Sequence, residues 1–190
     1  RTYGRHHRPE GRSQPMIFLY ETLFVPIRDF FEAGGDVLFG ILFVTILMWT
    51  LIIERIWFFY FVLPAKVRAT QEAWSSRADT FSWYARQVRQ QMVSEIGVEC
   101  RRYLPVIKAL MAILPLLGLL GTVTGMISVF DVMAFAGTGN ARLMAAGVYK
   151  ATIPTMSGLV AALSGLYFAA WLEQKSTREV EKTEDLLAHH

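Results

Sequence analysis

The sequence predicts an all-α membrane protein with three long transmembrane helices and helical extensions outside the bilayer. The chain has 190 residues, of which 53% are hydrophobic, and its mean hydropathy is +0.33. A soluble domain contains about 45–50% apolar residues and does not gather them in long blocks. Here they gather in three blocks, at 37–63, 104–136 and 143–172. Each block exceeds the roughly 20 residues with which an α-helix crosses a bilayer.

The first 36 residues predict a segment that lies outside the first span. Its apolar residues recur near 20, 23, 24, 27, 30 and 31, which is the spacing of one helical face. Pro26 and the neighbouring charges argue against a span, so we expect an amphipathic helix at the membrane interface. Gly34-Gly35 is expected to end this helix, and Asp36 to cap the next one. The first apolar run is long enough to span, so no cleavable signal peptide is expected.

The rest of the chain divides into spans and polar connections. We expect transmembrane helices at 37–63, 105–135 and 142–172, a helical polar segment at 64–104, a tight turn at 136–141 and a charged tail at 173–190. Pro115 predicts a kink in the second span. Lys and Arg gather in the polar segment and the tail, which the positive-inside rule places in the cytoplasm, with the N-terminus and the turn outside.

Small residues mark one face of each of the last two spans. They comprise Gly118, Gly121 and Gly125 in the second, and Gly158 in the third. In lipid, small residues let helix backbones approach closely. Pro154 opens the hydrogen-bond ladder of the third span. The two helices are expected to pack antiparallel and to form an inter-helix or inter-subunit lining. A monomer would leave these faces against lipid, so we also expect a stable homo-oligomer.

Few polar groups lie inside the spans. Thr122 and Thr155 stand among glycines near mid-depth, and each could bond its own helix or face a lumen. Lys150 lies about two turns inside the third span, where it could snorkel or face a wet lumen or a carboxylate. Asp131, at the outer end of the second span, is one candidate for that ion pair. Glu54 and Arg55 could snorkel or pair.

Several functions are not expected. All four histidines lie at the chain ends, and the sequence shows neither a phosphate loop nor paired carboxylates in mid-span, so an enzyme is not expected. We expect neither a metal nor another cofactor. The net charge of +3 reflects the basic cytoplasmic segments rather than nucleic-acid binding. Because no Asp or Glu lies near the middle of a span, proton movement would need a titrating group from a partner helix.

Two motifs resemble the MotA/TolQ/ExbB proton-channel family, most closely its ExbB and TolQ members. They are the run Leu114–Met126, similar to the family's second-helix signature, and the run Ala151–Ala162 in the third helix. The order of one span, a cytoplasmic segment and two long spans also matches, over about residues 35–175.

The resemblance implies a homopentamer around a central lumen in the bacterial inner (cytoplasmic) membrane, with a periplasmic N-terminus and a cytoplasmic C-terminus. The lumen would hold the anchors of an ExbD- or TolR-like single-span protein whose membrane aspartate carries the proton. The hydroxyls that face the lumen in the family fall on Thr122 and Thr155. The family commonly has glutamate five residues before the second threonine, and here that position is Lys150. Either the ion path differs, or Lys150 pairs with Asp131 or a partner carboxylate.

The function expected from this resemblance is that of a proton-channel subunit of an energy transducer. It would use the proton motive force to energise TonB-dependent outer-membrane transport by acting on a TonB- or TolA-like protein. The outer surface of the chain would contact membrane lipids. Two alternatives remain open: a TolQ-like motor of the cell envelope, and a non-conducting membrane scaffold with a dry core.

Overall fold

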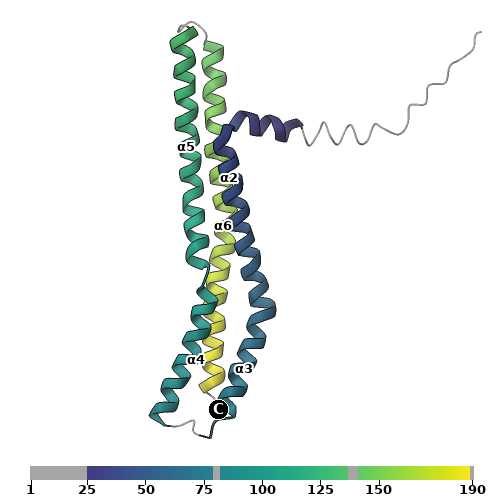
Figure 1. The fold of residues 1–190 in the computed structure, drawn as a ribbon, viewed down its shortest axis with the longest axis vertical. Helices are drawn as coiled ribbons and strands as arrows, with labels where there is room; N and C mark the ends of the chain where they lie inside the picture. Colours follow the sequence, from purple (N-terminus) through teal and green to yellow (C-terminus); the bar gives the residue numbers. More distant parts are fainter. Residues whose placement is uncertain (1–24, 79–81, 137–140, 189–190) are drawn as a thin grey trace, which may run out of the picture.

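The computed structural model describes residues 25–78, 82–136 and 141–188, and these are almost entirely helical. The elements are α2 (Val25–Trp57), the π-helix η2 (Phe58–Val62), α3 (Leu63–Ser75), α4 (Trp83–Arg101), α5 (Leu104–Ala136) and α6 (Ala141–Ala188). They form an elongated column in which α5 and α6 run side by side and α2 packs against both (Figure 1). The prediction of an all-helical chain is confirmed.

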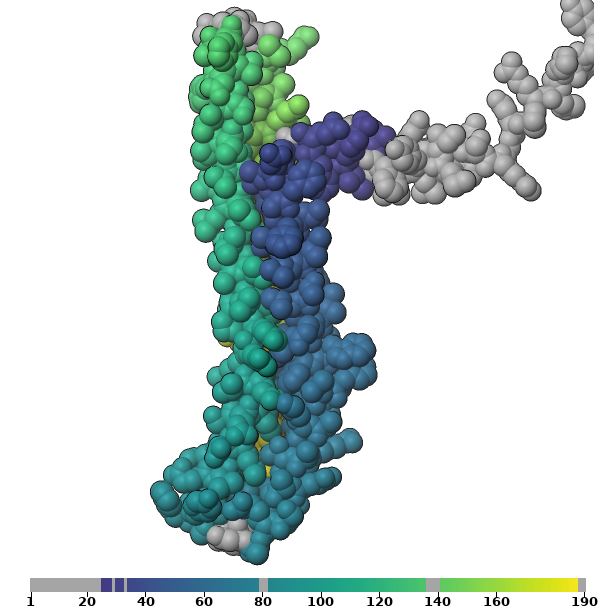
Figure 2. Space-filling model, viewed as in Figure 1, coloured from purple at the N-terminus to yellow at the C-terminus, as the bar shows by residue number. Residues whose placement is uncertain are grey.

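A sharp bend divides α2 near its beginning. Gly35 has φ 66° and ψ −168°, a backbone conformation that is essentially restricted to glycine. Residues 25–34 therefore turn away from the column, whereas residues 36–57 run along it (Figures 1 and 2). The bend lies where the sequence predicts the amphipathic helix to end. Residues 16–24 of that predicted helix lie outside the described residues.

The first long helix continues past residue 63, where the sequence predicts the span to end. A π-turn over Phe58–Val62 leads directly into α3, and the Leu63 N–H bonds the Phe58 carbonyl five residues back. Pro64 follows at the start of α3 and has no N–H for the carbonyl four residues before it, so a widened turn fits this position. The helix then runs to Ser75.

α5 matches its predicted span to within one residue, and α6 continues from its predicted span through the charged tail. α5 passes through Pro115, and α6 passes through Pro154 as one helix of 48 residues. The α-helix is continuous through Pro115, and the kink expected there stays a prediction. Beyond its apolar part, α6 packs against α4, where Val180 Cγ2 lies 3.7 Å from the position a Cβ would take on Gly97. The predicted tight turn falls on residues 137–140, outside the described part.

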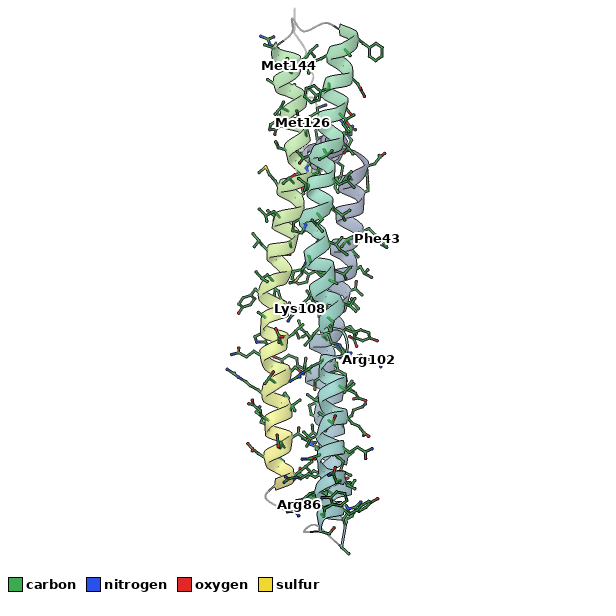
Figure 3. All side chains as sticks on the ribbon, turned by 90° about the vertical axis from the view of Figure 1, so that its left-hand side faces the viewer. Phe43, Arg86, Arg102, Lys108, Met126 and Met144 are labelled. Atoms are coloured by element: carbon green, nitrogen blue, oxygen red, sulfur yellow. The ribbon has the colours of Figure 1, made fainter. Side chains whose placement is uncertain are left out.

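Apolar side chains occupy both the inside and the outside of the column. Met48, Ile52, Ile107, Leu114 and Leu172 are fully buried along its axis. On the outside, Phe43 points away from α5 and α6 and is 69% exposed, and many other large apolar residues share this exposure (Figure 3). Three helices, within Gly34–Ser75, Trp83–Phe135 and Ala141–Leu187, are long and apolar enough to cross a membrane. This pattern is typical of membrane proteins, whose outer surface contacts lipid.

Candidate functional site

The contact between α5 and α6 is built on glycines. A Cβ added at Gly158 would lie 2.5 Å from the Leu114 carbonyl oxygen, and one at Gly118 would lie 2.9 Å from the Pro154 carbonyl oxygen. Real Cβ atoms essentially never approach heavy atoms closer than 3.0 Å. The two backbones are therefore closer together than any side chain at these positions would permit.

At the next two glycines of α5, a side chain of α6 occupies the space that a Cβ would take. A Cβ at Gly121 would meet the Pro154 Cβ at 2.4 Å, and one at Gly125 would meet the Ala151 Cβ at 2.7 Å. All five predicted packing residues thus lie at the helix contact within one chain. The expectation that a monomer would leave these small faces against lipid is wrong, because the chain covers them itself: Gly118, Gly121, Pro154 and Gly158 are buried.

Two threonines link the helices within this contact. The Thr155 hydroxyl donates across the helices to the Gly118 carbonyl at 2.9 Å, and it also lies within hydrogen-bond distance of the Thr122 hydroxyl. A hydroxyl has one proton, so a Thr155 hydroxyl that donates to the Gly118 carbonyl can accept from Thr122. The Thr122 hydroxyl also lies 3.4 Å from the same Gly118 carbonyl, in its own helix. Both side chains are half-buried. By contrast, Thr124 bonds only its own helix, to the carbonyls of Leu120 and Gly121 at 3.0 and 3.1 Å.

Lys150 points to the other side of the hairpin. Five residues separate it from Thr155, which at about 100° per residue places the two side chains about 140° apart around the helix. Lys150 lines a cavity formed with the bend of α2, whereas Thr155 faces Thr122. The structure therefore brings the two threonines together but does not bring Lys150 to them.

The predicted ion pair between Asp131 and Lys150 does not form within a chain. The salt bridges among the described residues include neither side chain, and both are exposed. The glycine contacts explain why: Gly125 faces Ala151, so Lys150 lies level with the turn of α5 that precedes Asp131. Along the helix axes the two residues are offset by about five residues, or about 7.5 Å, and their side chains do not meet in this arrangement.

Charged residues mark the two ends of the apolar hairpin. Lys108 bonds Glu173 at 2.8 Å between α5 and α6 at one end. Lys150 lies 23 residues before Glu173, or about 34 Å along the helix, close to the 30 Å of a hydrocarbon core. Thr155 lies about 8 Å from the Lys150 level and about 27 Å from that of Glu173. Measured between these two charges, the threonine pair lies nearer to the Lys150 end, and its depth in the bilayer stays a prediction.

A second polar cluster lies near the opposite end, where Glu54 and Arg55 were expected to snorkel or pair, and the two residues do pair. Arg55 is 3% exposed, bonds both Glu54 carboxylate oxygens at 2.7 and 2.9 Å, and donates to the Glu99 carbonyl at 2.9 Å. Its guanidinium also lies over the rings of Phe58 and Tyr103, at 4.6 and 4.5 Å from their centroids. In the sequence, this cluster is indicated by the adjacent opposite charges of Glu54 and Arg55 within an apolar helix. Arg55 ties the π-turn to the end of α4.

Cys100 lies beside this cluster in α4, outside the three apolar blocks. Its side chain is fully buried, and burial raises the pKa of the thiol to about 11, although the charge of Arg55 acts in the opposite direction. A buried thiol with this pKa is unreactive at neutral pH. Cys100 is therefore a packing residue of the cluster rather than a redox site.

Three apolar helices of membrane length and a hairpin joined through glycines and threonines define a polytopic helical membrane protein. Residues 65–185 match the MotA/TolQ/ExbB proton channel family, and because this covers more than half of the chain, the chain belongs to that family. This confirms the resemblance seen in the sequence.

Two curated relatives come from Synechocystis sp. The putative biopolymer transport protein ExbB-like 1 is 28% identical over 182 residues, covering 79% of this chain and 71% of the relative. The putative biopolymer transport protein ExbB-like 3 is 35% identical over 71 residues, covering 36% of this chain and 34% of the relative. The similarity to the first extends across most of both chains.

Proposed function

We propose that this chain is the channel-forming subunit of an ExbB-type motor in a bacterial inner membrane. Five copies would surround a lumen that holds the anchors of an ExbD- or TolR-like single-span partner. The motor would act through a TonB- or TolA-like protein to energise TonB-dependent outer-membrane transport. The observation that carries this proposal is the position of the pair Thr122–Thr155, which lies half-buried between two helices whose apolar stretches contain no charged residue.

The positions of the charged residues indicate which subunit would carry the proton. Between Lys108 and Asp131 on α5, and between Lys150 and Glu173 on α6, the chain has no charged residue. A proton crossing this region needs a titrating group, so the partner's membrane aspartate has to supply it. The threonine hydroxyls would stand beside that aspartate and support water or hydrogen bonds to it, without covalent chemistry, a metal or a cofactor.

Orientation rests on the distribution of basic residues. Lys and Arg gather in the segment 64–104 and the tail 173–190, which we place in the cytoplasm. The N-terminal segment and the turn at 136–141 then lie on the periplasmic side. In this orientation the bend at Gly35 turns residues 25–34 sideways in the periplasmic part of the column, and α5 and α6 continue past it (Figure 1).

Two other functions compete with this proposal. A TolQ-like motor of the cell envelope would use the same geometry with a different partner. A non-conducting scaffold is favoured by one specific observation: the threonine hydroxyls bond each other and the Gly118 carbonyl, and so they are satisfied without water. The scaffold and the channel differ in whether losing the hydroxyls abolishes energy transduction.

The test uses Thr122→Val, Thr155→Val and the double variant, with Thr124→Val as the matched control. Valine keeps the shape of threonine and removes the hydroxyl. We expect the double variant to assemble with its partner. Its energy-dependent uptake through the coupled outer-membrane transporter should fall by at least about tenfold. Thr124→Val should retain uptake, because that hydroxyl bonds only its own helix. Each lost hydrogen bond costs about 0.5–1.5 kcal/mol, so oligomer yield should change little. Full uptake by the double variant would favour the scaffold.

A further inference from the structure

A cavity of about 640 Å³ lies in the angle where α2 leaves the column. Glu32 and Asp36 line it from the bend, Thr124 and Ser128 from α5, and Lys150 from α6. Its volume falls within the range of small-molecule sites, which is about 300–1,000 Å³. Thr122 and Thr155 are not among the lining residues, although their neighbours Gly121 and Pro154 are.

The spacing of the charges on α6 indicates the depth of the cavity in a bilayer. Lys150 is about 34 Å from the Glu173 level, so these two charges bracket one hydrocarbon thickness. At the same level, residues 25–34 leave the column sideways and expose Ile27 and Phe30, at 50% and 43% of their surface. A helix with exposed apolar side chains that lies across the column at this depth fits the plane of the interface.

The cavity offers one cation and several acceptors. Among the described residues Lys150 has no ion pair, so its ammonium remains available to an anion. Asp36 likewise has no salt bridge within the described ranges, whereas Glu32 pairs with Arg28 at 3.3 Å. The hydroxyls of Thr124 and Ser128 donate to carbonyls of their own helix at 3.0 and 3.2 Å, which leaves their oxygens free to accept.

We propose that this cavity binds the headgroup of an ethanolamine phospholipid. The phosphate would contact the Lys150 ammonium, and the primary ammonium of the lipid would contact Asp36 and Glu32. The acyl chains would run along the exposed apolar face of α2. The charges discriminate between lipids: phosphatidylglycerol lacks the cation, and the quaternary ammonium of phosphatidylcholine has no N–H to donate. The site does not include the threonine pair on which the proposed function rests, and its test does not measure transport.

The experiment is a competition among lipids with matched acyl chains. The purified, delipidated protein is incubated with equal amounts of phosphatidylethanolamine, phosphatidylglycerol and phosphatidylcholine, and the retained lipid is quantified by native mass spectrometry. We expect wild type to enrich phosphatidylethanolamine about tenfold. Lys150→Gln and Asp36→Asn should abolish this enrichment. Lys108→Gln is the matched control, because Lys108 is an exposed lysine at the other boundary of the hairpin, and it should retain the enrichment.

A steric variant separates loss of charge from loss of space. Ala146 lines the cavity, and Ala146→Phe fills it without changing any charge, so enrichment should again be lost while helix content is unchanged. Equal enrichment in wild type, Lys150→Gln and Ala146→Phe would overturn the proposal. Preferential retention of phosphatidylglycerol would also overturn it, since that result defines a site for an anion alone. If Ala146→Phe lowers oligomer yield and leaves lipid retention unchanged, a second copy of the chain occupies the cavity and the proposal is wrong.

Discussion

Replacing Gly158 by alanine tests the close approach of α5 and α6. The new Cβ would lie 2.5 Å from the Leu114 carbonyl oxygen and 3.3 Å from the Gly118 Cα. Both neighbours are backbone atoms, which cannot rotate away as a side chain can. The helices must therefore separate by close to 1 Å before an ordinary van der Waals contact of about 3.4 Å is restored.

The cost follows from three terms. Overpacking costs about 1–3 kcal/mol, and lengthening the 2.9 Å bond from Thr155 to the Gly118 carbonyl costs about 0.5–1.5 kcal/mol more. The greater helix propensity of alanine returns about 0.5–1 kcal/mol. We expect Gly158→Ala to lower the free energy of unfolding by about 0.5–4 kcal/mol. The control is Gly40→Ala, where nothing lies within 4 Å of the new Cβ, so only the gain of about 0.5–1 kcal/mol remains.

The assay is unfolding of the purified protein in mixed micelles by titration with sodium dodecyl sulfate, followed by tryptophan fluorescence and circular dichroism. Opposite signs for the two glycine variants are the expected result. If Gly158→Ala were as stable as Gly40→Ala, the backbones would not be in contact and the geometry of the hairpin would be wrong.

Three further outcomes are expected. Gly35→Ala should cost about 1–3 kcal/mol in the same titration, because alanine resists φ 66° with ψ −168°; a stability equal to that of Gly40→Ala would show that the bend is not required. Arg55→Lys should cost about 1.5–3 kcal/mol, because lysine cannot reproduce the paired bonds to Glu54 and the bond to the Glu99 carbonyl; an unchanged midpoint would show that the cluster is not structural. Cys100 should react with maleimide at pH 7.5 far more slowly than in the unfolded chain, since the thiol is buried and its pKa is about 11; equal rates would contradict its burial.

The sequence predicted the helices well because long apolar blocks leave few alternatives in a membrane. It also indicated close packing through the glycines of α5 and α6. However, the sequence does not show which helix packs against a face of small residues. Packing within one chain and packing between subunits could therefore not be distinguished. The glycine distances answer this for Gly118 and Gly158, which meet backbone atoms of the same chain.

Other features depended on three-dimensional placement. The five-residue spacing of Lys150 and Thr155 already implied opposite sides of a helix, but the cavity at the bend of α2 needed the fold. The spacing of apolar residues does not indicate the π-turn at Phe58–Val62. In the sequence it is indicated by Pro64, which follows it. The burial of Arg55 depends on Tyr103 and the Glu99 carbonyl, which arrive from a distant part of the chain.

Proton flux in proteoliposomes tests the central claim most directly. The chain would be reconstituted alone, and together with its single-span partner, in vesicles that contain a pH-sensitive dye. After an acid pulse we predict proton entry only in vesicles with both proteins, and no entry when the partner's membrane aspartate is replaced by asparagine or when Thr122 and Thr155 are both valine. Proton entry that persists without the partner, or that is unaffected by removing both hydroxyls, would contradict this mechanism.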